Sequence, residues 1–403
     1  MLTEAERTRY VTELFQGNFG TAPELWARAP GRVDLMGSHT DYNLGHVLTV
    51  AINRDTWMAA RATNAGIVRV YSANLDEDDS FSLTSIERSS TKSWGNYIRG
   101  VAFVLQEHGL QLSGFDTVVH STVPLESGLS SSAALECATA VVFQALSGWH
   151  LEPKKMAQLC QKAENQFVGV KCGILDQYSS CLGKQGCALL LDCRCLSTRP
   201  VPIAHGIRMV ICDTCVPRRV AEGEYALRRG QCEEAAERLG LASLREVTLQ
   251  QLEARAGELP PQASKRARFI VMENERVLRL ADALPADDRA GIATLCAESF
   301  AGARDLYEIC SPAMLAMKDA MTDAPGVIGA RQAGAGFGGC MVALVEAEKT
   351  EDFRTGVIES YQKSMGVRPE TYTVEAAAGA GLLGSRSGEL SAATPLSSPE
   401  EAA

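Results

Sequence analysis

Residues 124–133, Pro-Leu-Glu-Ser-Gly-Leu-Ser-Ser-Ser-Ala, form the stretch on which the prediction of the fold depends. The preceding residues 115–123, FDTVVHSTV, are rich in β-branched side chains, which indicates a strand. The following residues 131–148, SSAALECATAVVFQALSG, are apolar nearly all round and end in glycine, which is typical of a buried helix. A strand, a tight loop and a buried helix are therefore expected to follow one another directly.

The loop between this strand and helix has the chemistry of a phosphate-binding site. Converging backbone N–H groups and the positive end of a helix dipole attract phosphate. Gly128 permits the turn, while Ser130, Ser131 and Ser132 cap the helix and offer hydroxyls to phosphate or Mg²⁺. The loop lacks lysine, so it is not a Walker A sequence. The competing interpretation is an ordinary serine-rich helix cap.

A second motif, GRVDLMGSHTDYN at residues 31–43, places a polar turn after a short apolar strand. His39 and Asp41 offer the donors and acceptors that the neighbouring hydroxyls of a polyol require. A third motif, GAGFGG at residues 334–339, matches G-x-G-x-x-G literally. A dinucleotide-binding fingerprint must open a helix, but CMVALVE at 340–346 reads as a strand, so we expect a loop packed against other backbone or a ligand.

The remaining sequence predicts a two-domain α/β (α+β) protein. Strand-like and helix-like segments alternate over residues 1–200, and alanine-rich helices dominate much of residues 201–384. Residues 385–403 are rich in Ser, Pro, Ala and Glu, with few bulky apolar groups, and are expected to be a disordered tail.

Composition excludes several classes of protein. A net charge of −10 argues against binding to nucleic acid, and the chain contains no apolar run long enough for a membrane span. The charged amphipathic N-terminus is not a signal peptide, and thirteen cysteines, many in apolar runs, suit reduced thiols, so a cytoplasmic protein is expected. The spacing of Cys193/Cys195 and Cys212/Cys215 resembles that of a zinc site. However, Cys193 and Cys212 end predicted strands, so buried thiols are the preferred interpretation.

Together the three motifs resemble, in order and spacing, the signature segments of the GHMP small-molecule kinases, and among these the galactokinases most closely. The stretches AENQFVGVKCGILDQYSSCLGKQGCALLLDCR and EYALRRGQCEEAAERLG also fit, so the resemblance covers about residues 10 to 380. It implies the two-domain GHMP kinase fold with the active site in the cleft between the domains. It also implies the use of ATP and Mg²⁺ to phosphorylate a sugar, galactose, at the anomeric C1 hydroxyl.

The resemblance further implies a role for individual residues. Asp176 would take the proton of the C1 hydroxyl, and Arg32 would offset charge near the transferred phosphate. Mg²⁺ would bind Ser132 and Glu164. The remaining implied contacts are to the sugar from Ser38, His39, Asp41, Gly173 and Tyr225, and to ATP from Trp94, Gly128, Ser130, Ser131 and Ser132.

The chain departs from the galactokinase pattern at a few positions. Ser38 stands where Glu is usual, and that Glu contacts the C6 hydroxyl of galactose. Asp34 replaces the usual Asn, and Glu126 and Ser127 replace two loop glycines. A shorter, neutral Ser38 leaves room at C6, so a kinase for L-arabinose or galacturonate stays an alternative. A non-catalytic sugar sensor is disfavoured because Ser130 to Ser132, Glu164 and Asp176 are all present. Sugar and ATP are the expected partners, and the oligomeric state stays open.

Overall fold

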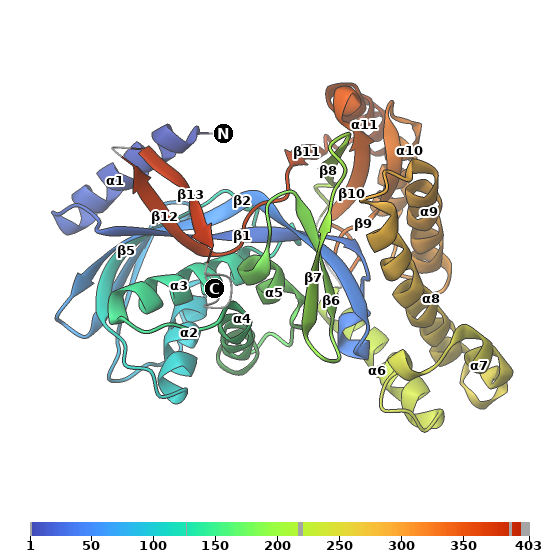
Figure 1. Cartoon of the computed structure of the whole chain (residues 1–403), viewed down its shortest axis with the longest axis horizontal. Helices are drawn as coiled ribbons and strands as arrows, with labels where there is room; N and C mark the ends of the chain where they lie inside the picture. Colours follow the sequence, from blue (N-terminus) through green and yellow to red (C-terminus); the bar gives the residue numbers. More distant parts are fainter. Residues whose placement is uncertain (1, 126, 217–220, 387–388, 396–403) are drawn as a thin grey trace, which may run out of the picture.

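The computed structural model describes residues 2–125, 127–216, 221–386 and 389–395, which form two β-sheets with helices packed against them (Figure 1). The larger sheet has nine strands within these residues, in the order β13-β12-β1-β2-β5-β3-β4, with β6 pairing with β2 and β7 pairing with β6. Its strands are β1 (Leu25–Met36), β2 (His46–Thr63), β3 (Ile67–Ser72), β4 (Glu77–Ser82), β5 (Gly114–Ser121), β6 (Cys187–Asp192), β7 (Ser197–Pro202), β12 (Gly381–Arg386) and β13 (Glu389–Pro395).

Strand β2 holds this sheet together because its two halves pair with different neighbours. Residues 46–49 pair with β6 and residues 56–63 pair with β5, while β1 runs antiparallel along the other edge. The polar residues 53–55 lie in the middle of this strand. The strand continues through them because Asp55, which is buried, has two arginine partners.

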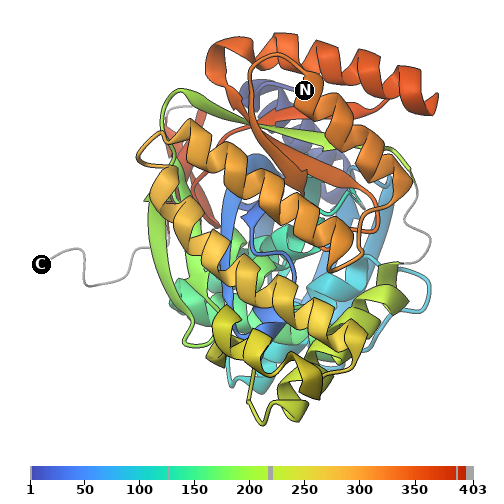
Figure 2. The ribbon, with the colours of Figure 1, turned by 90° about the vertical axis from the view of Figure 1, so that its right-hand side faces the viewer.

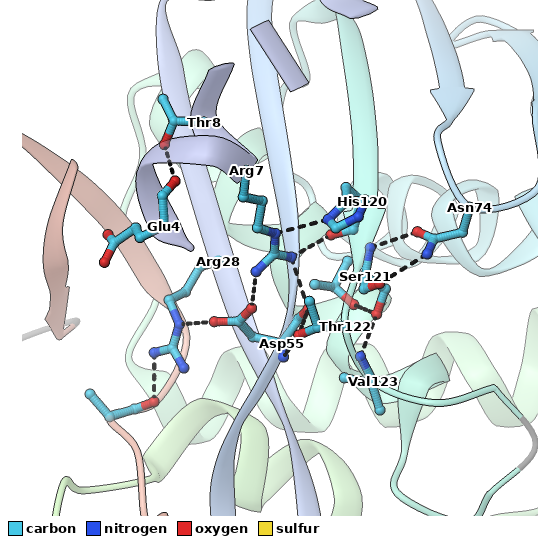
Figure 3. A network of polar contacts seen from close by, with 12 residues as sticks. Glu4, Arg7, Thr8, Arg28, Asp55, Asn74, His120, Ser121, Thr122 and Val123 are labelled. Carbon is cyan, nitrogen blue, oxygen red and sulfur yellow. Dashed lines mark hydrogen bonds and ion pairs between the residues drawn. The ribbon is translucent and has the colours of Figure 1, made fainter. Parts of the chain in front are cut away.

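These arginines belong to a network that fastens the N-terminal helix α1 (Glu4–Phe19) to the sheet (Figure 3). Arg7 of α1 lies 2.5 Å from one oxygen of Asp55, and Arg28 of β1 donates to the other oxygen at 2.7 Å. Arg28 also donates to the carbonyl of Ala378 at 2.9 Å, which ties in the C-terminal part of the chain. Burial acts against the charge of Asp55, but the two arginines outweigh it and hold the pKa of this carboxyl below its usual range.

The helices of the N-terminal half pack against the same sheet and share one apolar core with it. Helix α3 is buried along most of its length, which confirms the interpretation of its sequence. Residues 153–168 form an α-helix that continues directly as a π-helical stretch. These elements are α2 (Gly95–Glu107), α3 (Ser131–Ser147), α4 (Pro153–Lys162), the π-helix η2 (Ala163–Val168) and α5 (Leu175–Leu182).

The smaller sheet has the order β11-β8-β10-β9 and is antiparallel throughout. Its strands are β8 (Ile207–Asp213), β9 (Val327–Gln332), β10 (Cys340–Glu346) and β11 (Glu370–Val374). Figure 2 shows the long helices α8 and α9 on the outer side of this half, with α11 above them. The helices are α6 (Ala221–Arg238), α7 (Leu249–Ala254), α8 (Pro261–Ala283), α9 (Arg289–Asp305), α10 (Pro312–Asp323) and α11 (Thr350–Met365), joined by the short 3₁₀ turns η3 (Leu244–Glu246), η4 (Ala256–Glu258) and η5 (Ala347–Lys349); a further 3₁₀ turn, η1 (Asp41–Asn43), links β1 to β2.

The two halves share a continuous apolar core. Val33 and Leu35 of β1 belong to the same buried cluster as Met209 of β8, Val277 of α8 and Leu344 of β10. The chain leaves the larger sheet after β7 and enters the smaller one at β8, close to the division at residue 200 that the sequence suggested. Residues of both halves also line one cavity, among them Asp176 of α5 and Tyr225 of α6.

The end of the chain differs from the disordered tail that we expected over residues 385–403. Strand β12 pairs with β1, with Arg28 opposite Gly381, and β13 folds back antiparallel on β12. Backbone hydrogen bonds to a neighbouring strand can order a segment that has few apolar residues. The composition of residues 385–403 therefore did not predict this strand. Residues 387–388 and 396–403 lie outside the described residues.

Candidate active site

A cavity of about 570 Å³ lies between the two halves. That volume lies within the range of small-molecule sites. It gathers predicted site residues from distant parts of the chain: Arg32, His39, Asp41, Glu164, Gly173, Asp176 and Tyr225.

Arg32 and Asp176 form an ion pair on the wall of this cavity. The guanidinium of Arg32 lies 2.6 Å from Asp176 Oδ1, and its second end donates to the carbonyl of Gly128 at 2.6 Å. The neighbouring amide of Arg32 donates to Leu129 O at 3.0 Å. A side chain at Gly31 would collide with that carbonyl, so Gly31 lets β1 approach the phosphate loop closely. One arginine therefore joins the phosphate loop to the carboxylate predicted to act as the base.

Asp41 and Gly173 face each other at a second wall. A Cβ added to Gly173 would collide with the carboxylate of Asp41, so only glycine allows the loop before α5 to pack there. Burial raises the pKa of Asp41 to about 6; the charges of Asp34 and Asp176 add to this effect, and the Tyr42 backbone N–H opposes it. Asp41 therefore brings a buried carboxyl group to the wall of the cavity, next to Gly173.

His39 reaches the cavity in a left-handed conformation with φ of 67°. Its Nε2 lies 2.8 Å from the carbonyl of Ala335, and its Nδ1 lies 2.8 Å from the hydroxyl of Tyr42. Burial lowers the pKa of His39 to about 4, so the ring is neutral and donates from Nε2 to that carbonyl. Both nitrogens are thus used within the protein, which departs from the expectation that they hydrogen-bond a sugar. Instead, His39 connects the second and third motifs across the cavity, with the ring of Tyr225 centred 5.3 Å away.

Ser38 lies behind this wall, not on it. Its side chain is buried, accepts a hydrogen bond from Arg331 at 3.0 Å and donates to Asp34 Oδ2 at 3.4 Å. Asp34, in contrast, lines the cavity, and its Oδ1 is buried without a partner among the described residues. The carboxylate at this corner is therefore that of Asp34, and the geometry does not support direct contact of Ser38 with a ligand in the cavity.

The phosphate loop ends at α3 with a helix start that lacks a side-chain cap. Ser130 occupies the N-cap position in the left-handed conformation, and its hydroxyl is buried without a partner among the described residues. The expectation that the serines cap the helix is therefore wrong for Ser130, which takes the left-handed conformation instead of the extended one usual at an N-cap. Glu126 lies outside the described residues.

Glu164 lies on the π-helix η2, which brings its carboxylate toward the start of α3. Gln177 and Cys172 donate to Glu164 Oε2 at 2.7 Å and 3.1 Å. Burial raises the pKa of Glu164 and the charge of Asp176 adds to this, while hydrogen bonds from Cys172, Ser132 and Gln177 oppose it. A hydroxyl and a carboxylate side by side form an oxygen donor pair of the kind that Mg²⁺ prefers.

A smaller cavity of about 150 Å³ lies on the other side of the phosphate loop. Its wall is mainly apolar and includes Trp94, Leu125 and Leu135, together with Ser131 and Ser132. The indole N–H of Trp94 donates to Glu77 at 2.9 Å, which fixes the ring. Trp94, Ser131 and Ser132, predicted separately as ATP contacts, thus share one pocket.

The third glycine-rich motif forms a loop between β9 and β10. Gly334, Gly336, Gly338 and Gly339 all have positive φ, and the loop leads into a strand, which confirms that it is not a dinucleotide-binding fingerprint. The amide of Phe337 donates to Ile309 O at 2.7 Å, which anchors the loop.

Several residues of the site escaped the sequence analysis. Lys171 lines the main cavity, Arg331 holds Ser38, and Gln177 holds Glu164. The one sequence signal for Gln177 was its position directly after Asp176, since neighbours of a catalytic residue often support it. Arg331, 293 positions from Ser38, gave none.

Within the described ranges, no group of three or more His, Cys, Asp or Glu side chains is arranged to bind a metal ion. In the same part of the chain, no helix has both the length and the apolar character that crossing a bilayer requires.

Comparison with known families gives three matches, which together contain most of the residues that line the main cavity. Residues 13–62 match the galactokinase galactose-binding signature, residues 96–184 the N-terminal domain of GHMP kinases, and residues 280–362 the C-terminal domain of GHMP kinases. The three matches contain the second motif, the phosphate loop and the third motif respectively.

Individual proteins match over almost the full length. The chain is 43% identical to a galactokinase of Roseiflexus sp. (strain RS-1), over 93% of the chain and 97% of that protein. It is 45% identical to a galactokinase of Chloroflexus aggregans, over 91% and 95%. The structure of Lactococcus lactis galactokinase complexed with galactose superimposes with a TM-score of 0.88 at 33% identity, covering 92% of this chain and 98% of that one. A mevalonate kinase structure, at 16% identity and a TM-score of 0.61, shares the fold.

Proposed function

Because the chain belongs to the galactokinases of the GHMP kinase family, we propose that it transfers the γ-phosphate of ATP to the anomeric C1 hydroxyl of galactose. The Arg32–Asp176 pair carries this proposal, since the same guanidinium also binds Gly128 of the phosphate loop. A sugar hydroxyl beside Asp176 would thus lie at the boundary between the two cavities, where a phosphoryl group must cross.

The nucleotide would occupy the smaller cavity and the loop beside it. The apolar wall around Trp94 suits an adenine ring. The uncapped amides at the start of α3, with the unpartnered hydroxyl of Ser130, suit phosphate oxygens.

Ser132 and Glu164 would hold Mg²⁺, which when bound supplies positive charge that offsets the charge of the phosphates. Replacing Glu164→Gln should raise the free Mg²⁺ concentration needed for half-maximal rate, because a neutral amide is a weaker ligand than a carboxylate. An unchanged Mg²⁺ titration would mean that another group holds the metal.

In the transfer itself, Asp176 would accept the proton of the C1 hydroxyl as the oxygen attacks phosphorus. Arg32 would hold Asp176 in place and offset negative charge between it and the phosphate loop. The remainder of the protein's contribution is positioning, which is what phosphoryl transfer chiefly requires.

The sugar would be held by Asp41, the amide of Gly173, Tyr225 and Asp34. With Ser38 buried behind the wall, Asp34 offers the carboxylate at the corner where galactokinases usually carry Glu. A carboxylate there favours a hydroxyl at C6 over the acid group of galacturonate, because two like charges would meet. His39 would shape the wall without a free nitrogen.

A panel of sugars with ATP and Mg²⁺, following ADP release, tests the proposal. Galactose should give the highest catalytic efficiency, with L-arabinose and galacturonate below it. A higher efficiency for either competitor would change the assigned sugar, and no turnover with any sugar, despite galactose binding, would favour a sensor. We further propose a cytoplasmic location, because all thirteen cysteines are free thiols.

A further inference from the structure

Gln177 lies directly behind the site and contacts two buried carboxyl groups. Its side-chain amide nitrogen donates to Glu164 Oε2 at 2.7 Å and to Glu136 Oε2 at 2.9 Å. Gln177 and Glu136 are fully buried, and Glu164 is 4% exposed. An amide nitrogen has two hydrogens, so these two contacts use both of them.

If Glu136 is ionised, the second oxygens of Glu136 and Gln177 have no hydrogen-bond donor within the part of the chain that the structure describes. Glu136 Oε1 and Gln177 Oε1 are both buried, and neither has a partner among the described residues. Both are acceptors in that state, and each would be left unpaired at a considerable cost. A proton on Glu136 Oε1 resolves both, because that hydroxyl can then donate to Gln177 Oε1.

A carboxylic acid and an amide can form a cyclic pair because both groups are planar. In such a pair the hydrogen bond from Gln177 Nε2 to Glu136 Oε2 is joined by one from a hydroxyl at Glu136 Oε1 to Gln177 Oε1. Burial raises the pKa of Glu136 well above its usual range, and the charge of Glu164 adds to that effect. A neutral Glu136 thus fixes which end of the Gln177 amide faces Glu164.

That orientation determines which oxygen of Glu164 the Gln177 amide holds. Oε2 accepts hydrogen bonds from Gln177 and from the thiol of Cys172 at 3.1 Å, and Ser132 also donates to this carboxylate, so Oε1 is the oxygen that neither Gln177 nor Cys172 holds. If the Gln177 amide were reversed, its oxygen would face the carboxylate and repel it. Gln177 also follows Asp176 in α5, while Glu136 lies one turn after Ser132 in α3.

We propose that Gln177, held from behind by Glu136, is a positioning residue that presents Glu164 Oε1 to the metal and keeps α3, η2 and α5 in register. The inference rests on the proposed role of Glu164 as a Mg²⁺ ligand. It concerns residues that do not touch the substrates, so it predicts a change in metal requirement more than in sugar binding.

The test measures rate against free Mg²⁺ at saturating ATP and galactose, together with the KM for galactose. Gln177→Leu should raise the half-maximal Mg²⁺ concentration about tenfold or more, the effect typical of removing an outer hydrogen-bonding partner of a metal ligand, with the KM for galactose within about twofold of wild type. Glu136→Leu should shift the Mg²⁺ requirement in the same direction. Glu136→Gln should stay within about twofold, because a glutamine amide can accept from and donate to Gln177 as the neutral acid does.

Gln144→Leu is the matched control. Gln144 is a buried glutamine of the same helix α3, and its side chain accepts from the amide of Leu151. Its replacement should lower stability without moving the Mg²⁺ titration, which separates positioning from general destabilisation.

The outcomes distinguish the two proposals. If Glu164→Gln shifts the Mg²⁺ titration and Gln177→Leu does not, the positioning role is overturned and the metal assignment stands. If Glu164→Gln shifts nothing, the metal assignment falls and the positioning role falls with it. Should Gln177→Leu fail to fold, the infrared spectrum at neutral pH decides: the band of a protonated carboxyl group must be present in wild type and absent in Glu136→Gln. A spectrum unchanged by Glu136→Gln would overturn the proposal.

Discussion

Replacing Asp34→Ala should weaken the preference for galactose over 6-deoxygalactose. Asp34 lines the main cavity, is 3% exposed, and has one oxygen without a partner among the described residues. A sugar hydroxyl donating to that oxygen would satisfy it. Removing the side chain removes the acceptor but leaves the other cavity walls in place.

The size of the effect follows from the environment of Asp34. A hydrogen bond to a charged group contributes about 1.5–3 kcal/mol. Burial raises the pKa of Asp34, while Arg32 and Arg331 act in the opposite direction, and Oδ2 already accepts from Ser38. Because the carboxylate already interacts with these partners, we take the lower part of the range, about 1.5–2 kcal/mol, which corresponds to roughly a tenfold to thirtyfold change in the ratio of catalytic efficiencies.

The assay compares kcat/KM for galactose and 6-deoxygalactose in wild type, Asp34→Ala and the control Ser38→Ala. The control should change the ratio by less than about threefold, because Ser38 contacts Arg331 and Asp34 behind the wall. If Asp34→Ala leaves the ratio unmoved, or if Ser38→Ala moves it as much, then Asp34 does not read this hydroxyl and the argument from its unpaired oxygen fails.

Three further outcomes are expected. Asp176→Ala should lower turnover by roughly two to four orders of magnitude while ATP binding survives; unchanged turnover would remove this residue from the mechanism. The pKa of Asp41 is raised to about 6, so kcat/KM for galactose should fall as pH decreases below about 6, and Asp41→Asn should remove this fall. Because the pKa is raised in the folded state, the contribution of Asp41 to the free energy of unfolding is present at low pH and is lost as pH rises through about 6. In the absence of sugar, Asp41→Asn should therefore be no less stable than wild type at pH 8. Asp55→Asn should lower the free energy of unfolding in urea by about 3–5 kcal/mol at pH 7, because Arg7 and Arg28 stay buried without their anion. Since the pKa of Asp55 is lowered in the folded state, the difference in stability between wild type and variant should shrink as pH falls below about 4, and a difference that stays constant would contradict the ion-pair explanation.

The local sequence was sufficient to predict those features that depend only on residues close together in the chain. Gly128 and the serines that follow it stand between a strand and a buried helix, and both elements formed where the pattern indicated them. The glycines from residue 334 lead into an apolar strand, which is enough to reject the dinucleotide interpretation. Such features depend on neighbours within about ten residues, so the order of residue types carries them.

Tertiary structure alone decided which polar atoms remain free. Asp34 lies in β1 and Ser38 follows two residues after the strand ends, but a register shift in β1 after Asp34 and the distant Arg331 place the serine behind the wall and the carboxylate on it. His39 faces the cavity as expected, yet Ala335 and Tyr42 take both of its nitrogens.

The same holds for the groups behind the site and for the end of the chain. Glu164 reaches the start of α3 through a π-helical stretch that helical periodicity does not predict, and Gln177 joins it to Glu136 across three separate elements. Strand β13 forms because β12 offers it an edge, although its composition is that of a tail. Sequence determined the elements and the reactive groups, because these depend on local backbone preference and residue chemistry. The tertiary structure determined which of those groups are paired and which are free to bind a ligand, because pairing depends on partners that lie up to hundreds of residues away.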